Sequence, residues 1–288
     1  MRALSSVVAI TAAVAASAPC LAEEQVSDNV IQAWKKAGAH VSWVSTSGAW
    51  IDKPTAGYQV AFRIRGWTEG RFDALPLPEA PFHLDVSWPW TDEKSKDITD
   101  TGLKELIRFK NLRALLIFSR NVTDAGATEI AKLKGLEELD LSCTKVTAAG
   151  LKEIAKMRSI TRLSLGQIDV REEMLREVGG FKRLTRLDFA FTGSEFTAAG
   201  IRQIVKLERL HTLHFFGVNV SDAAVRELAR SKSLKDIDFL NAKVKEADVE
   251  ELRKRLPGCY VSLGTVDMTL PGLPQPAEFW QRKKGEPN

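Results

Sequence analysis

The sequence predicts an α/β fold in which short repeated units stack into a solenoid, with a curved parallel sheet inside and helices outside. Three observations carry this prediction. An apolar landmark recurs at a regular interval through the middle of the chain, as at Val122, Val146 and Val170. Each recurrence contains a helical half followed by a strand half. The seven tryptophans all lie outside residues 91–279, so the 288 residues are not one uniform domain.

Residues 1–22 are predicted to be a Sec-type signal peptide. A short basic start, Met1-Arg2, precedes an uncharged apolar stretch from Leu4 to Ala18, and Cys20-Leu21-Ala22 supplies small residues for cleavage after Ala22. The apolar stretch is shorter than the roughly 18 to 20 residues that a membrane span requires, and no later stretch is long enough. We therefore expect an exported protein, periplasmic or secreted, with no membrane span.

Residues 23–96 are expected to form an α+β cap over the open end of the repeat core. Residues 29–38 have the apolar spacing of a helix, residues 41–44 and 58–64 are predicted strands, and residues 84–86 have the pattern of a degenerate first repeat strand. A terminal unit needs such a cover because its outer face would otherwise expose the core. Most tryptophans are therefore expected to seal this edge, with ligand binding as the alternative.

The helical half of each unit reads V-T-D-A-G-x-x-E-I-A-K-L, as in Val122–Leu133. A threonine or serine precedes the apolar helical spacing and is predicted to cap the helix N-terminus. An aspartate often follows in the first turn, where negative charge suits the helix dipole. The predicted caps are Thr99, Thr123, Thr147, Thr197 and Ser221, and the first-turn aspartates are Asp100, Asp124 and Asp222.

The strand half reads L-x-x-L-x-L, as in Leu136–Leu141, and its period of two predicts a short strand with one buried face. A unit of one helix and one short strand cannot bury its apolar faces alone, so neighbouring units must stack. One interval of the repeat is two residues longer than the others. The two extra residues fall between Phe189 and Phe196, where a loop is expected to accommodate them.

Together these motifs resemble the leucine-rich repeat family, specifically its ribonuclease-inhibitor-like, helix-bearing class with V-T-D-A-G-L repeats, as in secreted bacterial proteins. The resemblance covers residues 97–264 and comprises about seven units, each of roughly 24 residues, a length within the range of this family. Residues 265–288, with four prolines, are predicted to form an extended tail. The resemblance implies a leucine-rich repeat solenoid that binds partners.

One position of the repeat departs from the family pattern, because its usual ladder Asn or Cys is replaced. The loop backbone must therefore be satisfied differently. The residues at that position are Arg120, Thr144, Ile168, Thr192, Val218 and Ala242.

Two cysteines remain after the predicted cleavage, Cys143 and Cys259, and neither belongs to a C-x-x-C pair. Cys143 is predicted beside the second full strand and Cys259 beside the last, five strands further on. At ~4.8 Å per strand they lie roughly 24 Å apart, whereas a disulfide needs Cα atoms within about 7 Å. We therefore predict two free, mostly buried thiols.

No catalytic, metal-binding or cofactor-binding motif is recognisable, so we expect no catalytic residue, no metal and no cofactor. The patterns H-E-x-x-H, G-x-S-x-G, G-x-G-x-x-G and the P-loop are all absent. His211 and His214 superficially suggest a metal pair, but on a strand they would point to opposite faces. The chain is therefore not expected to be an enzyme.

Side chains between and just after the strand leucines are expected to point into the concavity, where stacking aligns them in columns. The central column runs Asp85, Leu116, Asp140, Ser164, Asp188, His214 and Asp238, and its neighbour runs His83, Ala114, Glu138, Arg162, Arg186, Thr212 and Asp236. Aromatic and arginine side chains are favoured at binding hot spots. The alternative is that the aspartates only solvate the sheet and the phenylalanines turn inward. The candidate partner-binding residues are Phe118, Phe191, Phe216, His214, Asp140, Asp188, Asp238, Arg162, Arg186 and Trp88.

Lys and Arg number 41 against 37 Asp and Glu, a formal net charge of +4 that is too dispersed to indicate a nucleic-acid partner. We expect an exported, non-enzymatic binding protein whose concave face recognises a protein, peptide or cell-envelope component. Two alternatives stay open: a hydrolase or other enzyme with an unrecognised site in the cap, and a ubiquitin-ligase-type substrate adaptor or effector. An adaptor should carry a helical docking module before the repeats, whereas residues 23–90 look strand-rich.

Overall fold

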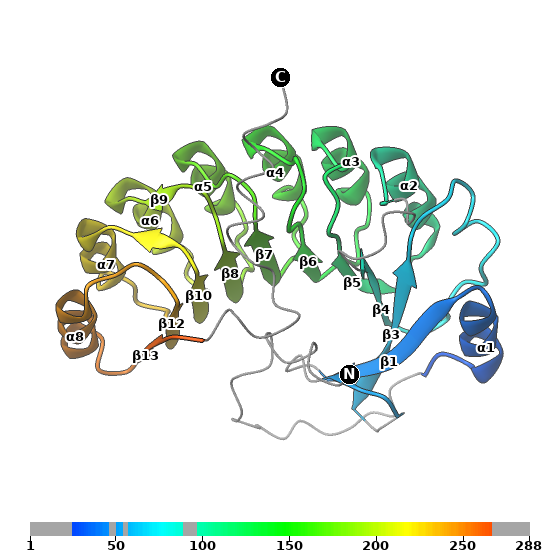
Figure 1. Ribbon diagram of the computed structural model, residues 1–288, viewed down its shortest axis with the longest axis horizontal. Helices are drawn as coiled ribbons and strands as arrows, with labels where there is room; N and C mark the ends of the chain where they lie inside the picture. The colour runs from blue at the N-terminus through cyan, green and yellow to red at the C-terminus, as the bar shows by residue number, and fades with distance from the viewer. Residues whose placement is uncertain (1–24, 46–49, 54–56, 89–96, 267–288) are drawn as a thin grey trace.

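The repeated units stack side by side into an arc, with strands on the inner side and helices on the outer side (Figure 1). The computed structural model describes residues 25–45, 50–53, 57–88 and 97–266, without the side chains of Trp50, Ser87 and Trp88. The predicted signal peptide, the predicted tail from residue 267, Trp90 and Trp280 lie outside the described residues.

One sheet of 11 strands runs through the described part of the molecule, in the order β13-β12-β10-β8-β7-β6-β5-β4-β3-β1-β2. Every pairing from β3 to β13 is parallel, whereas β1 is antiparallel to both β2 and β3. The strands are β1 (Ala39–Ser45), β2 (Trp50–Ile51), β3 (Tyr58–Arg65), β4 (Phe82–Trp88), β5 (Leu112–Leu116), β6 (Glu138–Asp140), β7 (Arg162–Gly166), β8 (Arg186–Ala190), β10 (Thr212–Phe216), β12 (Asp236–Leu240) and β13 (Tyr260–Gly264). The predicted first repeat strand therefore exists as β4, parallel to β5.

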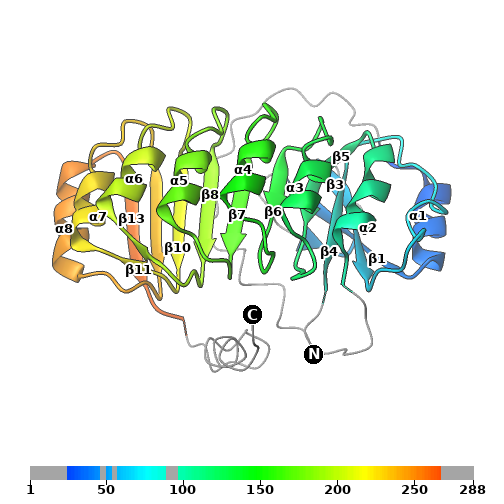
Figure 2. The ribbon, with the colours of Figure 1, turned by 90° about the horizontal axis from the view of Figure 1, so that it is seen from above.

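The helices form one row along the outer side of the arc, as the view from above shows (Figure 2). They are α1 (Asp28–Lys36), α2 (Asp100–Glu105) with the 3₁₀ turn η1 (Leu106–Arg108), α3 (Asp124–Ile130), α4 (Ala148–Ile154), α5 (Glu172–Val178), α6 (Ala198–Ile204), α7 (Asp222–Leu228) and α8 (Glu246–Arg255). The two extra residues lie in the loop after β8, as predicted. The loop leads into β9 (Glu195–Phe196), which pairs with β11 (Asn219–Val220) in a second, small sheet.

The predicted helix caps are confirmed, because each threonine or serine side chain accepts a backbone N–H from the first helical turn. The first-turn aspartates do more than suit the helix dipole. Asp124 in α3 accepts the Thr147 amide at 2.7 Å, the Thr147 hydroxyl at 2.7 Å and the Gly150 amide at 3.0 Å. Asp100 accepts the amide and hydroxyl of Thr123 in the same way. These aspartates therefore join each unit to the next one.

The buried core repeats with the same period as the sequence. Leu139, Leu163, Leu187 and Leu213 lie opposite one another on adjacent strands and are almost completely buried. In the C-terminal units phenylalanine replaces leucine at the next core position. The rings of Phe189, Phe215 and Phe239 stack, with centroids 5.9 and 5.3 Å apart. Their large apolar surfaces hold these units together by burial and ring stacking.

The turn after each strand extends the backbone hydrogen bonding of the sheet through a residue in the left-handed conformation. One residue there has a positive φ in five successive units, with values from 49° to 60°. These residues are Cys143, Gln167, Phe191, Gly217 and Asn241. Each of their amides donates to a carbonyl of the next unit at 2.7 to 2.9 Å, which continues the sheet ladder beyond the strand. The left-handed conformation is disfavoured for most residues, and this hydrogen bond offsets part of its cost.

Three tryptophans with described side chains pack in the cap region. Trp34 on α1 is fully buried, stacks on Phe62 with centroids 4.2 Å apart, and donates its Nε1 hydrogen to the Pro76 carbonyl at 3.0 Å. Trp43 and Trp67 are partly buried and pack against the same core. A Cβ at Gly102 would lie 2.7 Å from the Trp67 ring, so the glycine of the first T-x-x-G motif makes room for the cap.

The two described cysteines are free, as predicted. Cys143 is buried, whereas Cys259 is only half-buried. Burial raises the pKa of the Cys259 thiol to about 11, so the thiol stays protonated and poorly nucleophilic at neutral pH.

Replacing Asp124 by alanine is expected to lower the free energy of unfolding by about 2 kcal/mol, because three hydrogen bonds to the next helix N-terminus are lost. Asp222→Ala is the matched control, since Asp222 holds the same position in α7 but pairs with the exposed side chain of Lys245. Urea unfolding of both variants measures the difference. Equal losses for the two variants would contradict the proposed role of the aspartate between units.

Candidate functional site

The strand pairing places the two predicted columns on the concave face. Along the central column, Asp140 on β6, Ser164 on β7, Asp188 on β8, His214 on β10 and Asp238 on β12 lie directly opposite one another in turn. The strand leucines point to the other side, into the core. The columns are therefore aligned as the sequence predicts, with neighbouring side chains roughly 4.8 Å apart.

Four of these side chains form a compact group that we call the ionic cluster: Arg186, Asp188, His214 and Asp236. Arg186 Nε lies 2.9 Å from Asp188 Oδ2, and His214 Nδ1 lies 2.9 Å from Asp188 Oδ1. His214 Nε2 lies 3.9 Å from Asp236 Oδ2. The side chains are 16% to 26% exposed, so these charges interact in a partly desolvated environment.

The cluster favours a protonated His214. Burial by itself lowers the pKa of His214, but the hydrogen bond to Asp188 and the nearby carboxylate of Asp236 outweigh it and raise the pKa to about 9. Burial acts in the opposite sense on Asp188, yet the hydrogen bond from His214 and the charge of Arg186 keep its pKa below the usual value. Arg186 Nη2 also lies 3.2 Å from His214 Nδ1. A protonated ring cannot accept that hydrogen, so we assign Nδ1–H to the bond with Asp188.

Two polar atoms of the cluster lack hydrogen-bond partners among the described residues. They are His214 Nε2, a donor when the ring is charged, and Asp236 Oδ1, an acceptor. Both atoms are covered by neighbouring side chains in this structure. A buried polar atom without a partner costs about 1–3 kcal/mol, so both atoms lower the stability of the folded protein.

The other predicted charged residues lie around the cluster. Arg162 on β7 pairs with Glu138 on β6, with Nη2 and Oε2 2.7 Å apart. Asp238 accepts a hydrogen bond from the Ser262 hydroxyl on β13. Burial raises the pKa of Asp140 to about 7, and the charges of Asp188 and Glu138 add to this against the hydrogen bonds from Ser142. Asp140 is therefore partly protonated near neutral pH.

Two of the predicted phenylalanines form a pair beside the ionic cluster. The Phe191 and Phe216 rings meet edge to face, with centroids 4.5 Å apart. Phe216 lies between Ala190 and Leu240 on the neighbouring strands. A Cβ at Gly217 would lie 2.5 Å from the Phe191 ring, so this glycine is what allows the ring to lie there. Both side chains are half-buried rather than turned fully into the core.

Phe118 does not join this pair. Phe118 follows β5, whereas Phe191 follows β8. The strands β6 and β7 lie between them in the sheet. The residues that hold the same register position between them are small: Ser142, Gly166 and Ala190. The structure therefore brings together two of the three predicted phenylalanines. Trp88 ends β4, and its side chain lies outside the described part of the chain.

Two further residues of the concave face, Tyr260 and Asp236, are not among the partner-binding residues predicted from the sequence. Tyr260 on β13 lies directly opposite Asp236 and is 66% exposed, the largest exposure among the large apolar side chains of the described residues. The sequence held the signal for Tyr260, because it follows Asp236 by the same interval that separates Asp236 from Thr212. The column that contains Thr212 and Asp236 therefore continues for one more unit, to Tyr260 on β13.

At the cap end of the concave face, the titratable side chains His83 and Asp85 are already paired. His83 is hydrogen-bonded to Gln59 at 3.0 Å, and burial together with the charge of Arg162 lowers its pKa to about 4. Asp85 forms an ion pair with Arg63 at 2.7 Å. Neither group is presented as a free acid or base.

The described residues contain no group of three or more His, Cys, Asp or Glu side chains arranged to hold a metal ion. In the same part of the chain, no helix combines the length and the apolar character needed to cross a bilayer.

The fold is an α/β leucine-rich repeat solenoid, because repeated strand–helix units stack along a mostly parallel sheet. No family model matches the chain, and no curated protein matches it either. Among solved structures, the chain is similar to internalin C2 from Listeria monocytogenes, with 15% identity and a TM-score of 0.44, over 85% of this chain and 100% of that one. It is also similar to the plant peptide hormone receptor RGFR1 in complex with RGF2, with 13% identity and a TM-score of 0.29, over 65% of this chain and 36% of that one. The ribonuclease-inhibitor-like class stays a prediction.

The raised pKa of His214 makes stability depend on pH in a defined direction. The folded-state value of about 9 exceeds the unfolded value of about 6.5, so the stabilisation is fully present below pH ~6.5 and is lost as the pH rises to about 9. Imidazole signals in NMR should show one histidine titrating near 9 and one, His83, near 4.

Between pH 6.5 and 9 the free energy of unfolding is expected to fall by about 2 kcal/mol because of His214. His214→Gln is expected to remove most of this fall, and urea unfolding at the two pH values measures it. His211→Gln is the control, since His211 lies just before β10 and is exposed. A His214 signal that titrates at the ordinary value would contradict the geometry of the cluster.

Proposed function

We propose that this protein binds a segment of a protein or peptide on its concave face, without catalysing a reaction. The observation that carries the proposal is the Phe191–Phe216 pair, half-exposed beside the ionic cluster on the concave face. Aromatic side chains next to arginine are typical of binding hot spots. The proposed occupant is a segment of a protein or peptide that carries an apolar side chain next to a basic one.

The aromatic pair supports the apolar part of this occupant. Phe191 is held by the turn and by the edge of Phe216, and Leu240 extends the apolar surface on the next strand. A partner side chain that packs there removes apolar area from water, worth about 25 cal/mol per Å². Because the rings are fixed before binding, little side-chain entropy is lost.

The charge of the concave face supports the basic side chain of the proposed occupant. Between β6 and β12, five acidic side chains share the concave face with three cationic ones, so this part of the face has a negative net charge. Asp236 is 21% exposed, and the exposed ring of Tyr260 lies opposite it. A Lys or Arg side chain of the partner would donate to Asp236 and lie against that ring, which is a favourable cation–π arrangement. The five carboxylates are Glu138, Asp140, Asp188, Asp236 and Asp238, and the cations are Arg162, Arg186 and His214.

We further propose that binding takes place outside the cytoplasm, on the basis of the predicted signal peptide. The enzyme alternative needs a free acid or base in the cap, and the pairing of His83 and Asp85 does not favour one. The adaptor alternative needs a helical docking module before the repeats. In the described residues the cap instead contributes β1, β3 and β4 to the main sheet.

Selection from a displayed library of random peptides tests the chemistry of the occupant. The protein from residue 23 is immobilised and peptides are selected on it, with subtraction on the Phe191→Ala/Phe216→Ala variant. Enriched sequences should place an aromatic or aliphatic side chain next to Lys or Arg. Enrichment of acidic sequences, or of the same sequences on both proteins, would contradict the proposal.

The affinity of one selected peptide for variants of the protein then tests the aromatic pair and Asp236 separately. Phe216→Ala is expected to weaken binding by at least about tenfold, and Asp236→Asn by several-fold with a reduced dependence on salt. Phe118→Ala is the matched control, a half-buried phenylalanine at the same register position on another unit, and should change the affinity less than about twofold. Isothermal titration measures all three, with thermal unfolding as the check that each variant is folded.

A further inference from the structure

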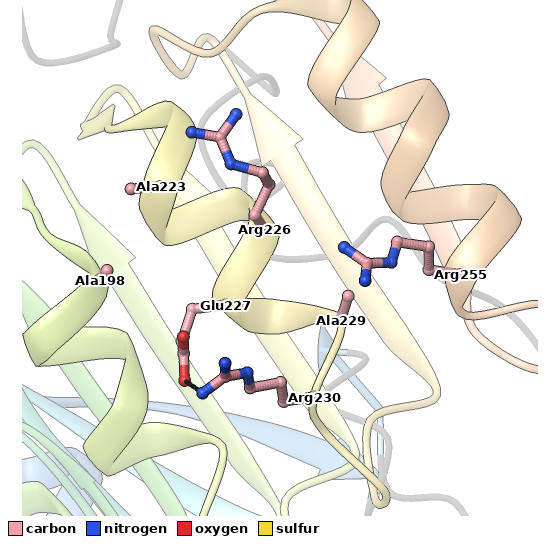
Figure 3. A pocket seen from close by; sticks show the side chains of 7 residues that line it. All are labelled: Ala198, Ala223, Arg226, Glu227, Ala229, Arg230 and Arg255. Carbon is pink, nitrogen blue, oxygen red and sulfur yellow. Dashed lines mark hydrogen bonds and ion pairs between the residues drawn. The ribbon is translucent and has the colours of Figure 1, made fainter.

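The convex face carries a hollow that the concave-face function does not use. It lies over α7, between α6 and the end of α8, and has a volume of about 310 Å³ (Figure 3). Three arginines line it, Arg226 from α7, Arg230 from the turn after α7 and Arg255 from α8, together with Glu227. Alanines 198, 223 and 229 make up the rest of the lining, and their small side chains leave the space open.

The hollow holds more positive than negative charge. Arg230 lies 3.0 Å from Glu227, which also receives Arg202 at 3.4 Å, so one carboxylate serves two guanidinium groups. Arg226 lies 3.2 Å from Asp248 on α8. Arg255 has no carboxylate partner among the described residues and directs its guanidinium toward Ala229 in Figure 3. Asp248 and Glu227 balance Arg226 and Arg230, so among the lining arginines only Arg255 leaves a positive charge without a carboxylate.

The length of α8 places Arg255 at the hollow. The helices α3 to α7 have 7 residues each, whereas α8 has 10, and its additional turn ends at Arg255. Arg226 lies in α7 and Arg230 in the turn that follows it, so the end of this unit's helix supplies the other two arginines. The hollow is thus not a feature that recurs with the repeat. It arises where the last helix is longer than the others.

We propose that this hollow binds a phosphate group. Planar guanidinium groups match the oxygens of phosphate and donate to them in pairs, and they do so without losing their charge. Glu227 is 8% exposed and already accepts from two arginines, so it orients Arg230 rather than repelling an anion at the open side. The source of the phosphate is either a small soluble phosphorylated molecule or the headgroup of a phospholipid.

Phosphorus NMR of inorganic phosphate with the protein from residue 23 tests the site. The wild-type protein is expected to bind phosphate saturably, and Arg255→Gln to weaken it by roughly tenfold without breaking an ion pair. Lys254→Gln is the matched control, because Lys254 is the exposed neighbour of Arg255 and does not line the hollow. Equal weakening by the two variants would show a general charge effect and overturn the proposal, as would the absence of saturable binding.

Vesicles then distinguish the two sources. Flotation compares vesicles containing phosphatidylglycerol with vesicles of phosphatidylcholine alone, for the wild type, Arg255→Gln and Lys254→Gln. Retention that needs phosphatidylglycerol and Arg255, and that inorganic phosphate reverses, identifies a headgroup. Phosphate binding that needs Arg255 without vesicle retention identifies a soluble phosphorylated molecule. Vesicle retention that is the same for both variants would contradict a headgroup site.

Discussion

A single unit of one strand and one helix cannot bury its own apolar faces, and the rest of the structure depends on this constraint. Every unit is stable only when its neighbours cover it. The hydrogen bonds follow the same rule, since the Asp124 carboxylate bonds to the next helix and the amide of Cys143 bonds to the next strand. Because both kinds of contact join equivalent positions, the units stack in one register from β5 to β13. A slip would break the core and the ladders together.

This register also makes the functional surfaces. Side chains at one position of successive units come within one strand spacing of each other, so a sequence column becomes a continuous strip. On the concave face such strips gather Arg186, Asp188, His214 and Asp236, which lie within one small region although they come from three different units. The convex hollow has the opposite origin, because Arg255 lies there only since α8 exceeds the length of the other repeat helices. Repetition builds the first surface, and a departure from repetition builds the second.

The ionic cluster is poorly explained by stability alone. Partly buried ion pairs lose hydration that their mutual attraction only partly restores, and apolar residues in their place are often neutral or stabilising. Two atoms of the cluster also lack partners among the described residues. The Phe191–Phe216 pair adds apolar surface that the core does not fully cover. Both features are costs for an isolated solenoid, and the aromatic surface becomes favourable when a partner covers it, which is the physical basis of the binding function we propose.

The sequence by itself determined the repeat, the order of helix and strand, the threonine caps and the columns of the concave face, because these depend on local spacing, on the period of two along a strand and on the regular interval between units. It also determined that Cys143 and Cys259 stay apart. Tertiary structure alone decided which side chains of a column pair with one another, that Phe191 meets Phe216 and not Phe118, and that Asp124 bonds to the following helix. Those outcomes depend on the direction and rotamer of each side chain between units and on close contacts such as Phe191 over Gly217, which no spacing along one chain specifies.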